Sequence, residues 1–142
     1  MTAITAPEVS SSSRFNAAVI ARHIGRVLLG GLFTFSSVMF FLMPTPPAPE
    51  GQAGVFVAGL AAAGYLMPLV KIVELISGLA LLSNRFVPLA LVLLAPITVN
   101  ILGVHSTVLP SGLPVAIVII AIQLALAWSH RAAFAPMLRA KN

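Results

Sequence analysis

A lysine and a glutamate lie one helical turn apart inside an otherwise apolar stretch of the chain. Lys71 and Glu74 are three positions apart, so a helix would place them on one face, where they can pair. A single charge at the centre of a bilayer costs about 2.5–3.5 kcal/mol to insert, and such buried ionisable groups commonly mark functional sites. We interpret the pair as a candidate site for handling protons or binding a polar ligand. The alternative is a structural ion pair that fixes helix rotation, with Lys71 extending toward the membrane surface.

Two further polar side chains lie in a later apolar stretch. Asn100 is predicted at a depth similar to that of Lys71, so it could hydrogen-bond to the pair or simply join two helices. His105 ends the same stretch, and because histidine titrates near neutral pH it could relay protons or contact a quinone carbonyl. It could equally be an ordinary polar residue at the membrane surface. The two positions differ by about 140° around a helix, so the sequence does not require them to face one cavity.

The sequence excludes several classes of chemistry. It contains no cysteine, which rules out thiol catalysis, thiolate-bound zinc, ordinary iron–sulfur ligation and covalent haem attachment within this chain. It also contains no phosphate-binding loop, nucleophile elbow, metal-ligand spacing or dinucleotide fingerprint. We therefore predict no metal site and no encoded cofactor, and the only small molecule we consider as a cofactor is a bound quinone.

The composition is that of a membrane protein. Hydrophobic residues make up 59% of the chain and charged residues only 8%, with a mean hydropathy of +1.06. A soluble domain normally carries about 25% charged residues to cover its surface. The net charge of +5 comes from basic residues scattered singly at the ends of apolar segments. This pattern does not form a nucleic-acid-binding stripe and favours anionic lipid headgroups as the partner.

Four apolar segments are long enough to cross a bilayer, which takes roughly 20 residues. They cover residues 17–43, 65–83, 86–108 and 113–130. The first two are separated by a proline-rich stretch, 44–51, which cannot be helical, and by 52–64, which we predict to be a short helix at the membrane surface or slightly re-entrant. The predicted fold class is therefore an all-α integral membrane four-helix bundle with a short interfacial helix between helices 1 and 2.

The basic residues predict how the bundle is oriented. Seven of the eight fall outside the bilayer on one predicted side, and these are Arg14, Arg22, Arg26, Arg85, Arg131, Arg139 and Lys141. The loops 44–64 and 105–112 hold no lysine or arginine. The positive-inside rule then places both termini and the Asn84–Arg85 turn in the cytoplasm. We expect membrane-interface anchors at Arg22, Arg26, Arg85, Arg131, Tyr65 and Trp128.

The remaining polar and small residues carry weaker expectations. Residues 1–13 read as a disordered cytoplasmic tail, and 14–142 as one transmembrane domain. Small residues should let helices approach closely, and these are Gly25, Gly30, Gly31, Ala121, Ala125 and Ser129. Hydroxyls of the first segment (Thr34, Ser36, Ser37) can bond to carbonyls of their own helix. Gln123 has no obvious partner, while His23 and His130 are expected to act as surface anchors.

Several short motifs, in order, resemble the DoxX family. They are Ile24–Gly30 with Phe33–Ser36, Gly64–Tyr65, Glu74-x-x-x-Gly78 with Leu81-Leu82-x-x-Arg85, Asn84–Leu91, Leu94–Ile97, Asn100–Ile101 and then His105. The resemblance covers residues 17–138. It implies a four-helix protein of the bacterial inner membrane. Only Glu74, Arg85, Asn100 and His105 carry over by position as family-like site residues.

The resemblance also implies a link to electron transfer. One branch of the family is a thiosulfate–quinone oxidoreductase subunit, and others associate with oxidative-stress enzymes. We therefore expect an accessory subunit of a membrane redox or respiratory-type complex, partnered by that larger complex or by copies of itself, with a quinone-like or lipid-like ligand. The alternatives are an autonomous quinone-linked oxidoreductase subunit and an oligomeric transporter of a small solute. Because no redox centre is encoded, activity of the chain alone is the weaker expectation.

Overall fold

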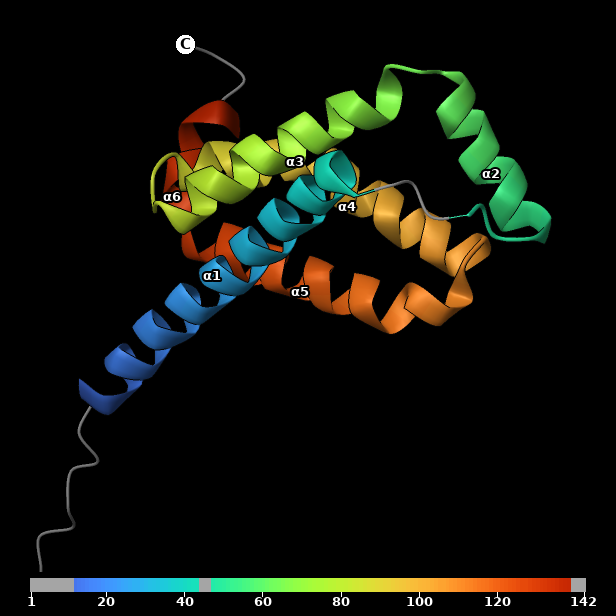
Figure 1. Cartoon of the computed structure of the whole chain (residues 1–142). Coiled ribbons are helices and arrows are strands. Elements are labelled where there is room, and N and C mark those ends of the chain that lie inside the picture. The colour runs from blue at the N-terminus through green and yellow to red at the C-terminus, as the bar shows by residue number, and fades with distance from the viewer. Residues whose placement is uncertain (1–11, 44–46, 139–142) are drawn as a thin grey trace, which may run out of the picture.

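Every regular element in the described part of the chain, residues 12–43 and 47–138, is a helix in the computed structural model (Figure 1). The helices are α1 (Ser12–Leu42), α2 (Gly51–Ala62), α3 (Leu66–Leu82), α4 (Val87–Thr107), α5 (Leu113–Ser129) and α6 (Arg131–Phe134), with 3-10 turns η1 (Pro110–Gly112) and η2 (Ala135–Leu138). Some residues used in the sequence predictions lie outside the described part of the chain. They are residues 1–11 of the expected tail, Pro44, Pro46, Arg139, Lys141 and the side chain of Arg14. Ser12 and Ser13, which we expected in the tail, belong to α1.

Within residues 12–43 and 47–138, three helices are long and apolar enough to cross a membrane. They are Ala17–Leu42, Val87–Thr107 and Pro110–Ser129. The 17-residue α3 becomes a fourth candidate when it is taken together with α2, although the two helices meet at an angle of 87°. Large apolar side chains cover the outward faces of these helices, as Ile76, Val99 and Leu124 do, each more than half exposed. An exposed apolar surface of this extent favours lipid contact over water.

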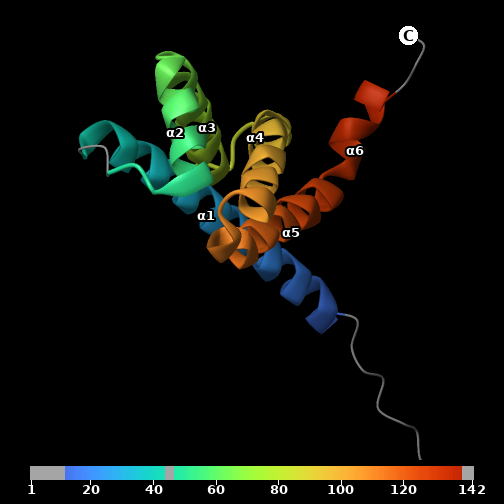
Figure 2. The ribbon, with the colours of Figure 1, turned by 90° about the vertical axis from the view of Figure 1, so that its right-hand side faces the viewer.

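The four long helices pack in a ring. Helix α1 contacts α3 and α5, and α4 contacts the same two helices, while α1 crosses the others obliquely (Figures 1 and 2). The short α3–α4 and α4–α5 connections make these pairs antiparallel neighbours, as predicted. The core is built mainly from the end of α3, the first half of α4 and facing positions of α1 and α5. Its buried members are Leu29, Phe33, Leu81, Val87, Ala90, Leu91, Leu94, Ile119 and Leu126.

Two glycines set the crossing of α1 and α3. A Cβ added at Gly78 would lie 2.9 Å from the carbonyl oxygen of Gly30, and one added at Gly30 would lie 3.0 Å from that of Gly78. Gly25 is close to Ile122 of α5, whereas a Cβ at Gly31 would meet nothing within 4 Å. The expected close approach is therefore confirmed at Gly25 and Gly30 and is absent at Gly31.

The α3–α4 turn is tied to α1 by one side chain. The guanidinium of Arg26 donates to the carbonyl oxygen of Leu81 at 2.6 Å and to that of Leu82 at 3.2 Å. The last carbonyls of a helix lack partners within it, so Arg26 stabilises the end of α3. Asn84 and Phe86 then reverse the chain with φ of 57° and 53°. Arg26 thus lies within α1 and caps the end of α3.

Candidate ligand-binding site

Lys71 and Glu74 form the ion pair predicted from their spacing. The Lys71 Nζ lies 2.7 Å from Glu74 Oε2, and only 3% of Glu74 is exposed. Both residues project from α3 toward α1. There the Lys71 ammonium donates to Ser36 Oγ at 2.9 Å, and the Ser37 hydroxyl makes a longer 3.4 Å contact to Glu74 Oε2. These bonds offset part of the cost of removing two charges from water.

The serines of α1 therefore do not bond to their own helix as expected. Ser36 and Ser37 form hydrogen bonds with Lys71 and Glu74 of α3 instead. The Gly30–Gly78 crossing brings the two helices close enough for these short hydroxyl side chains to reach across. This contact could have been predicted from the sequence. Ser36 and Ser37 lie about as far from the end of α1 as Lys71 lies from the start of α3, so antiparallel packing places them at similar depth. Nearby, the hydroxyl oxygens of Thr34 and Ser77 are buried without a hydrogen-bond partner.

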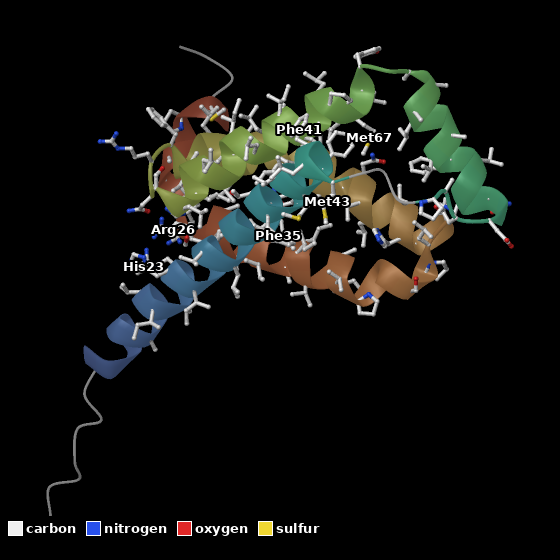
Figure 3. The ribbon with its side chains drawn as sticks, viewed as in Figure 1. His23, Arg26, Phe35, Phe41, Met43 and Met67 are labelled. Atoms are coloured by element: carbon white, nitrogen blue, oxygen red, sulfur yellow. The ribbon has the colours of Figure 1, made fainter. Side chains whose placement is uncertain are left out.

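All four predicted site residues line one cavity of about 240 Å³. Lys71, Glu74, Asn100 and His105 contribute its polar groups. The walls are apolar and come from α2, α3 and α4, and they comprise Phe56, Leu60, Leu66, Met67, Val70, Ile97, Ile101 and Val104. Figure 3 labels Met67, which lies on α3 on the side toward α2. The sequence did not reveal that α2 supplies part of this wall.

Asn100 and His105 share the cavity despite their angular separation on α4. The ring of His105 folds back along its helix, with Nδ1 2.7 Å from the carbonyl oxygen of Ile101. Because a carbonyl only accepts, this nitrogen carries the proton. The ring also lies against Gly112, where an added Cβ would collide with it. Asn100 is exposed, and within the described chain no hydrogen bond joins it to the Lys71–Glu74 pair, so the direct contact considered above is not made.

The polar groups of the cavity keep unused hydrogen-bonding capacity. A lysine ammonium has three N–H donors, and Lys71 uses two of them, on Ser36 and Glu74. Both described bonds to the Glu74 carboxylate reach Oε2, so Oε1 stays able to accept. A ligand that offers one acceptor and one donor would therefore find partners here without breaking the ion pair.

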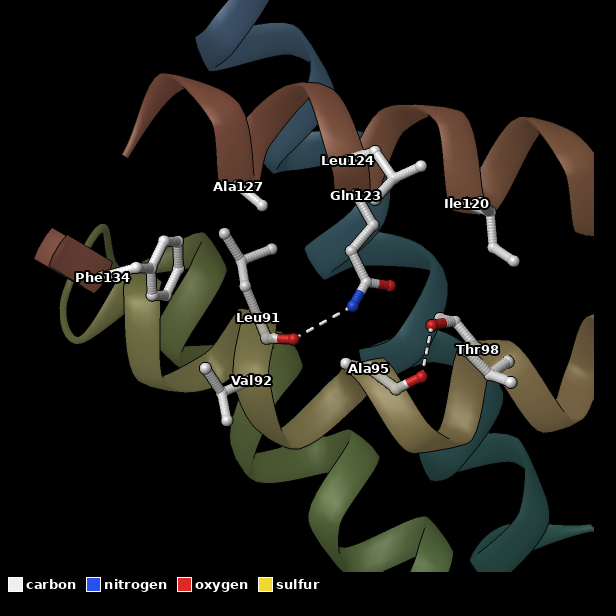
Figure 4. Close-up of a pocket in the computed structure, with 10 residues that line it drawn as sticks. Leu91, Val92, Ala95, Thr98, Ile120, Gln123, Leu124, Ala127 and Phe134 are labelled. Atoms are coloured by element: carbon white, nitrogen blue, oxygen red, sulfur yellow. Dashed lines mark hydrogen bonds between the residues drawn. The ribbon is translucent and has the colours of Figure 1, made fainter. Parts of the chain in front are cut away.

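Gln123 marks a second, mostly apolar cavity of about 220 Å³ between α4 and α5 (Figure 4). Its side-chain N–H donates to the carbonyl oxygen of Leu91 at 3.0 Å, while its Oε1 is buried without a partner. The partner of Gln123 could not be predicted from the sequence, because it is a backbone carbonyl on another helix and every residue type carries one. The stretch near Leu91 also contains Pro96, which lacks the N–H that would bond to the carbonyl of Val92.

Four of the six expected interface anchors lie at or beside helix ends, whereas Arg22 and Arg26 lie within α1. Tyr65 precedes α3 and Trp128 is near the end of α5, and both are about 70% exposed. The Arg131 guanidinium lies 5.4 Å from the Trp128 ring centre, within the range of a cation–π contact. Arg22 and Arg85 are exposed, in keeping with contact to lipid headgroups.

Comparison with known proteins returns no relative. No protein-family model, curated protein or solved structure matches this chain. Within the described residues there is also no group of three or more histidine, aspartate or glutamate side chains placed to hold a metal ion.

Proposed function

We propose that this protein is a DoxX-like four-helix membrane protein that binds a quinone-like or lipid-like molecule in the Lys71–Glu74 cavity. In this proposal α1, α3, α4 and α5 each cross the inner membrane, with both termini in the cytoplasm. The chain acts as an accessory subunit of a membrane redox complex. The observation that carries the proposal is that Lys71, Glu74, Asn100 and His105 line one cavity.

The composition of the cavity supports a ligand with an apolar body and a polar head. Small-molecule sites are mostly apolar with a few polar groups that fix orientation. Here the unused N–H of Lys71 could donate to a quinone carbonyl, and Oε1 of Glu74 could accept from a quinol hydroxyl. The cavity is flanked by lipid-facing helices, so a lipophilic molecule could reach it from the bilayer.

The position of α2 supports its role as an interfacial helix that closes the cavity. With α3 along the membrane normal, the 87° bend lays α2 in the membrane plane. Phe56 and Leu60 of α2 then cover the outer end of the cavity. A helix in this position would shield the ion pair from water.

The test is binding of a decyl-substituted benzoquinol, kept reduced so that its hydroxyls can donate to Glu74, to the purified chain in detergent, measured by native mass spectrometry. Glu74→Gln keeps the shape of the side chain but removes its charge, and we expect it to weaken binding about tenfold or more. Glu50→Gln makes the same chemical change on an exposed residue before α2 and should leave binding unchanged. Equal binding by wild-type protein and Glu74→Gln would refute the site. Isolation of the gently solubilised protein without a stoichiometric partner would refute the accessory role.

A further inference from the structure

A third cavity, which is polar, lies at the end of the molecule opposite the Lys71–Glu74 cavity. It measures about 190 Å³ and is lined by Val19, Arg22, His23, Arg26, Asn84 and His130. The residues come from α1, the α3–α4 turn and the end of α5, so three separate segments meet there. Figure 3 labels His23 and Arg26, which lie on α1 near the end of α3. One water needs about 10–15 Å³, so the cavity can hold a larger polar group.

The charges around this cavity favour an anion. None of its lining residues is acidic. The two glutamates in the described part of the chain are elsewhere, because Glu50 precedes α2 and Glu74 lines the first cavity. Arg26 uses Nη1 on the carbonyls that end α3, whereas the one polar contact of Arg22 among the described residues is a 3.4 Å contact to the carbonyl oxygen of Ala18 in its own helix. The Arg22 guanidinium therefore keeps most of its five donors for a ligand.

The neighbouring side chains add donors to the same cavity. Arg26 Nη2 lies 3.3 Å from Nδ1 of His23. Because a guanidinium can only donate, Nδ1 accepts, and the neutral ring carries its proton on Nε2, where it can donate outward. The side-chain amide of Asn84, which also lines the cavity, makes no hydrogen bond to the described residues and offers two more N–H groups. Arginine with several convergent N–H donors is the typical environment of a bound phosphate.

We infer that this cavity binds the phosphate headgroup of an anionic phospholipid. The lipid assignment follows from position. The exposed apolar side chains of Val27 and Leu28 follow the cavity residues on α1 in the direction of the bilayer centre, so a lipid tail could run along α1 into the membrane while its headgroup occupies the cavity. Basic pockets between membrane helices on the cytoplasmic side commonly bind such headgroups. This site is independent of the Lys71–Glu74 cavity and of any ligand bound there.

The experiment measures lipid binding to the full chain in detergent by native mass spectrometry. Phosphatidylglycerol and phosphatidylcholine with identical acyl chains are titrated separately, and inorganic phosphate is titrated in a third series. We expect phosphatidylglycerol to bind about tenfold more tightly than phosphatidylcholine, and Arg22→Gln to weaken that binding about tenfold. Arg85→Gln removes the same charge at the same end of the molecule but outside the cavity, and it should change the affinity by less than about twofold.

Three results would overturn the inference. Equal weakening by Arg85→Gln would show attraction to general surface charge, and equal binding of the two lipids would show no headgroup selection. Displacement of phosphatidylglycerol by millimolar inorganic phosphate would assign the site to a free anion. His23→Ala provides a second variant, which removes a donor without changing the cap that Arg26 places on α3, and it should also weaken phosphatidylglycerol binding selectively.

Discussion

Lys71 is held by partners on two helices. Its ammonium contacts Glu74 on its own helix and Ser36 on α1, and the side chain is only 14% exposed. Removing one member of a buried ion pair leaves the other charge uncompensated, which costs more than removing both. Substitutions at Lys71 and Glu74 therefore measure how much the ion pair contributes to the stability of the protein.

We predict that Lys71→Met destabilises the protein by about 3–5 kcal/mol, because Glu74 would keep a charge with only the distant hydroxyl of Ser37 beside it. The double variant Lys71→Met with Glu74→Gln should recover a large part of this loss. Unfolding of the purified protein by titration with a denaturing detergent measures both values. Strictly additive effects of the two substitutions would contradict an energetic coupling of the pair.

At the level of elements, the crossing of α1 and α3 places the serines opposite the ion pair. The crossing depends on bare backbone at Gly30 and Gly78, where each glycine faces the other helix's carbonyl oxygen. Backbone atoms cannot rotate away as a side chain can, so any added methyl group must push the helices apart.

We predict that Gly78→Ala destabilises the protein by about 1–3 kcal/mol, as overpacking of a tight interface does. Gly31→Ala is the matched control, since the same methyl group would enter open space one residue beyond the crossing. It should change stability by less than about 1 kcal/mol and in the favourable direction, because alanine is the better helix former. The same detergent titration compares them, and equal effects would show that the crossing is not tight.

At the scale of the whole molecule, the number of membrane crossings decides which side each loop faces. In the part of the chain that the structure describes, three helices qualify by length and composition, and the fourth candidate combines α2 and α3 at a sharp bend. If α3 crosses, the α3–α4 turn lies on the same side of the membrane as the N-terminus. If it does not, that turn lies on the same side as the proline-rich loop.

The absence of cysteine from the chain makes single-cysteine labelling a clean test. We predict that Ala48→Cys reacts with a membrane-impermeant maleimide in intact cells, whereas Ser83→Cys reacts only after the cells are permeabilised. Labelling of both Ala48→Cys and Ser83→Cys in intact cells would mean that α3 does not cross. Protection of Ala48→Cys would reverse the proposed orientation.

The sequence alone determined where the helices lie. Hydropathy and proline positions predicted segments close to α1, α3, α4 and α5, because in lipid the backbone must satisfy its own hydrogen bonds and only long apolar helices do so. Spacing alone also predicted the Lys71–Glu74 pair, since both residues lie within one helical turn. The orientation in the membrane and the resemblance to DoxX proteins stay predictions.

Only the tertiary structure decided which side chains meet across helices. It brought Ser36 and Ser37 to the ion pair, joined Gln123 to the carbonyl of Leu91, and placed Asn100 and His105 in one cavity. It also gathered arginines and histidines that had been interpreted as separate anchors into one basic cavity. These contacts depend on how each helix is rotated and where it crosses its neighbour. In near-uniformly apolar helices, hydrophobic periodicity is too weak to specify either quantity.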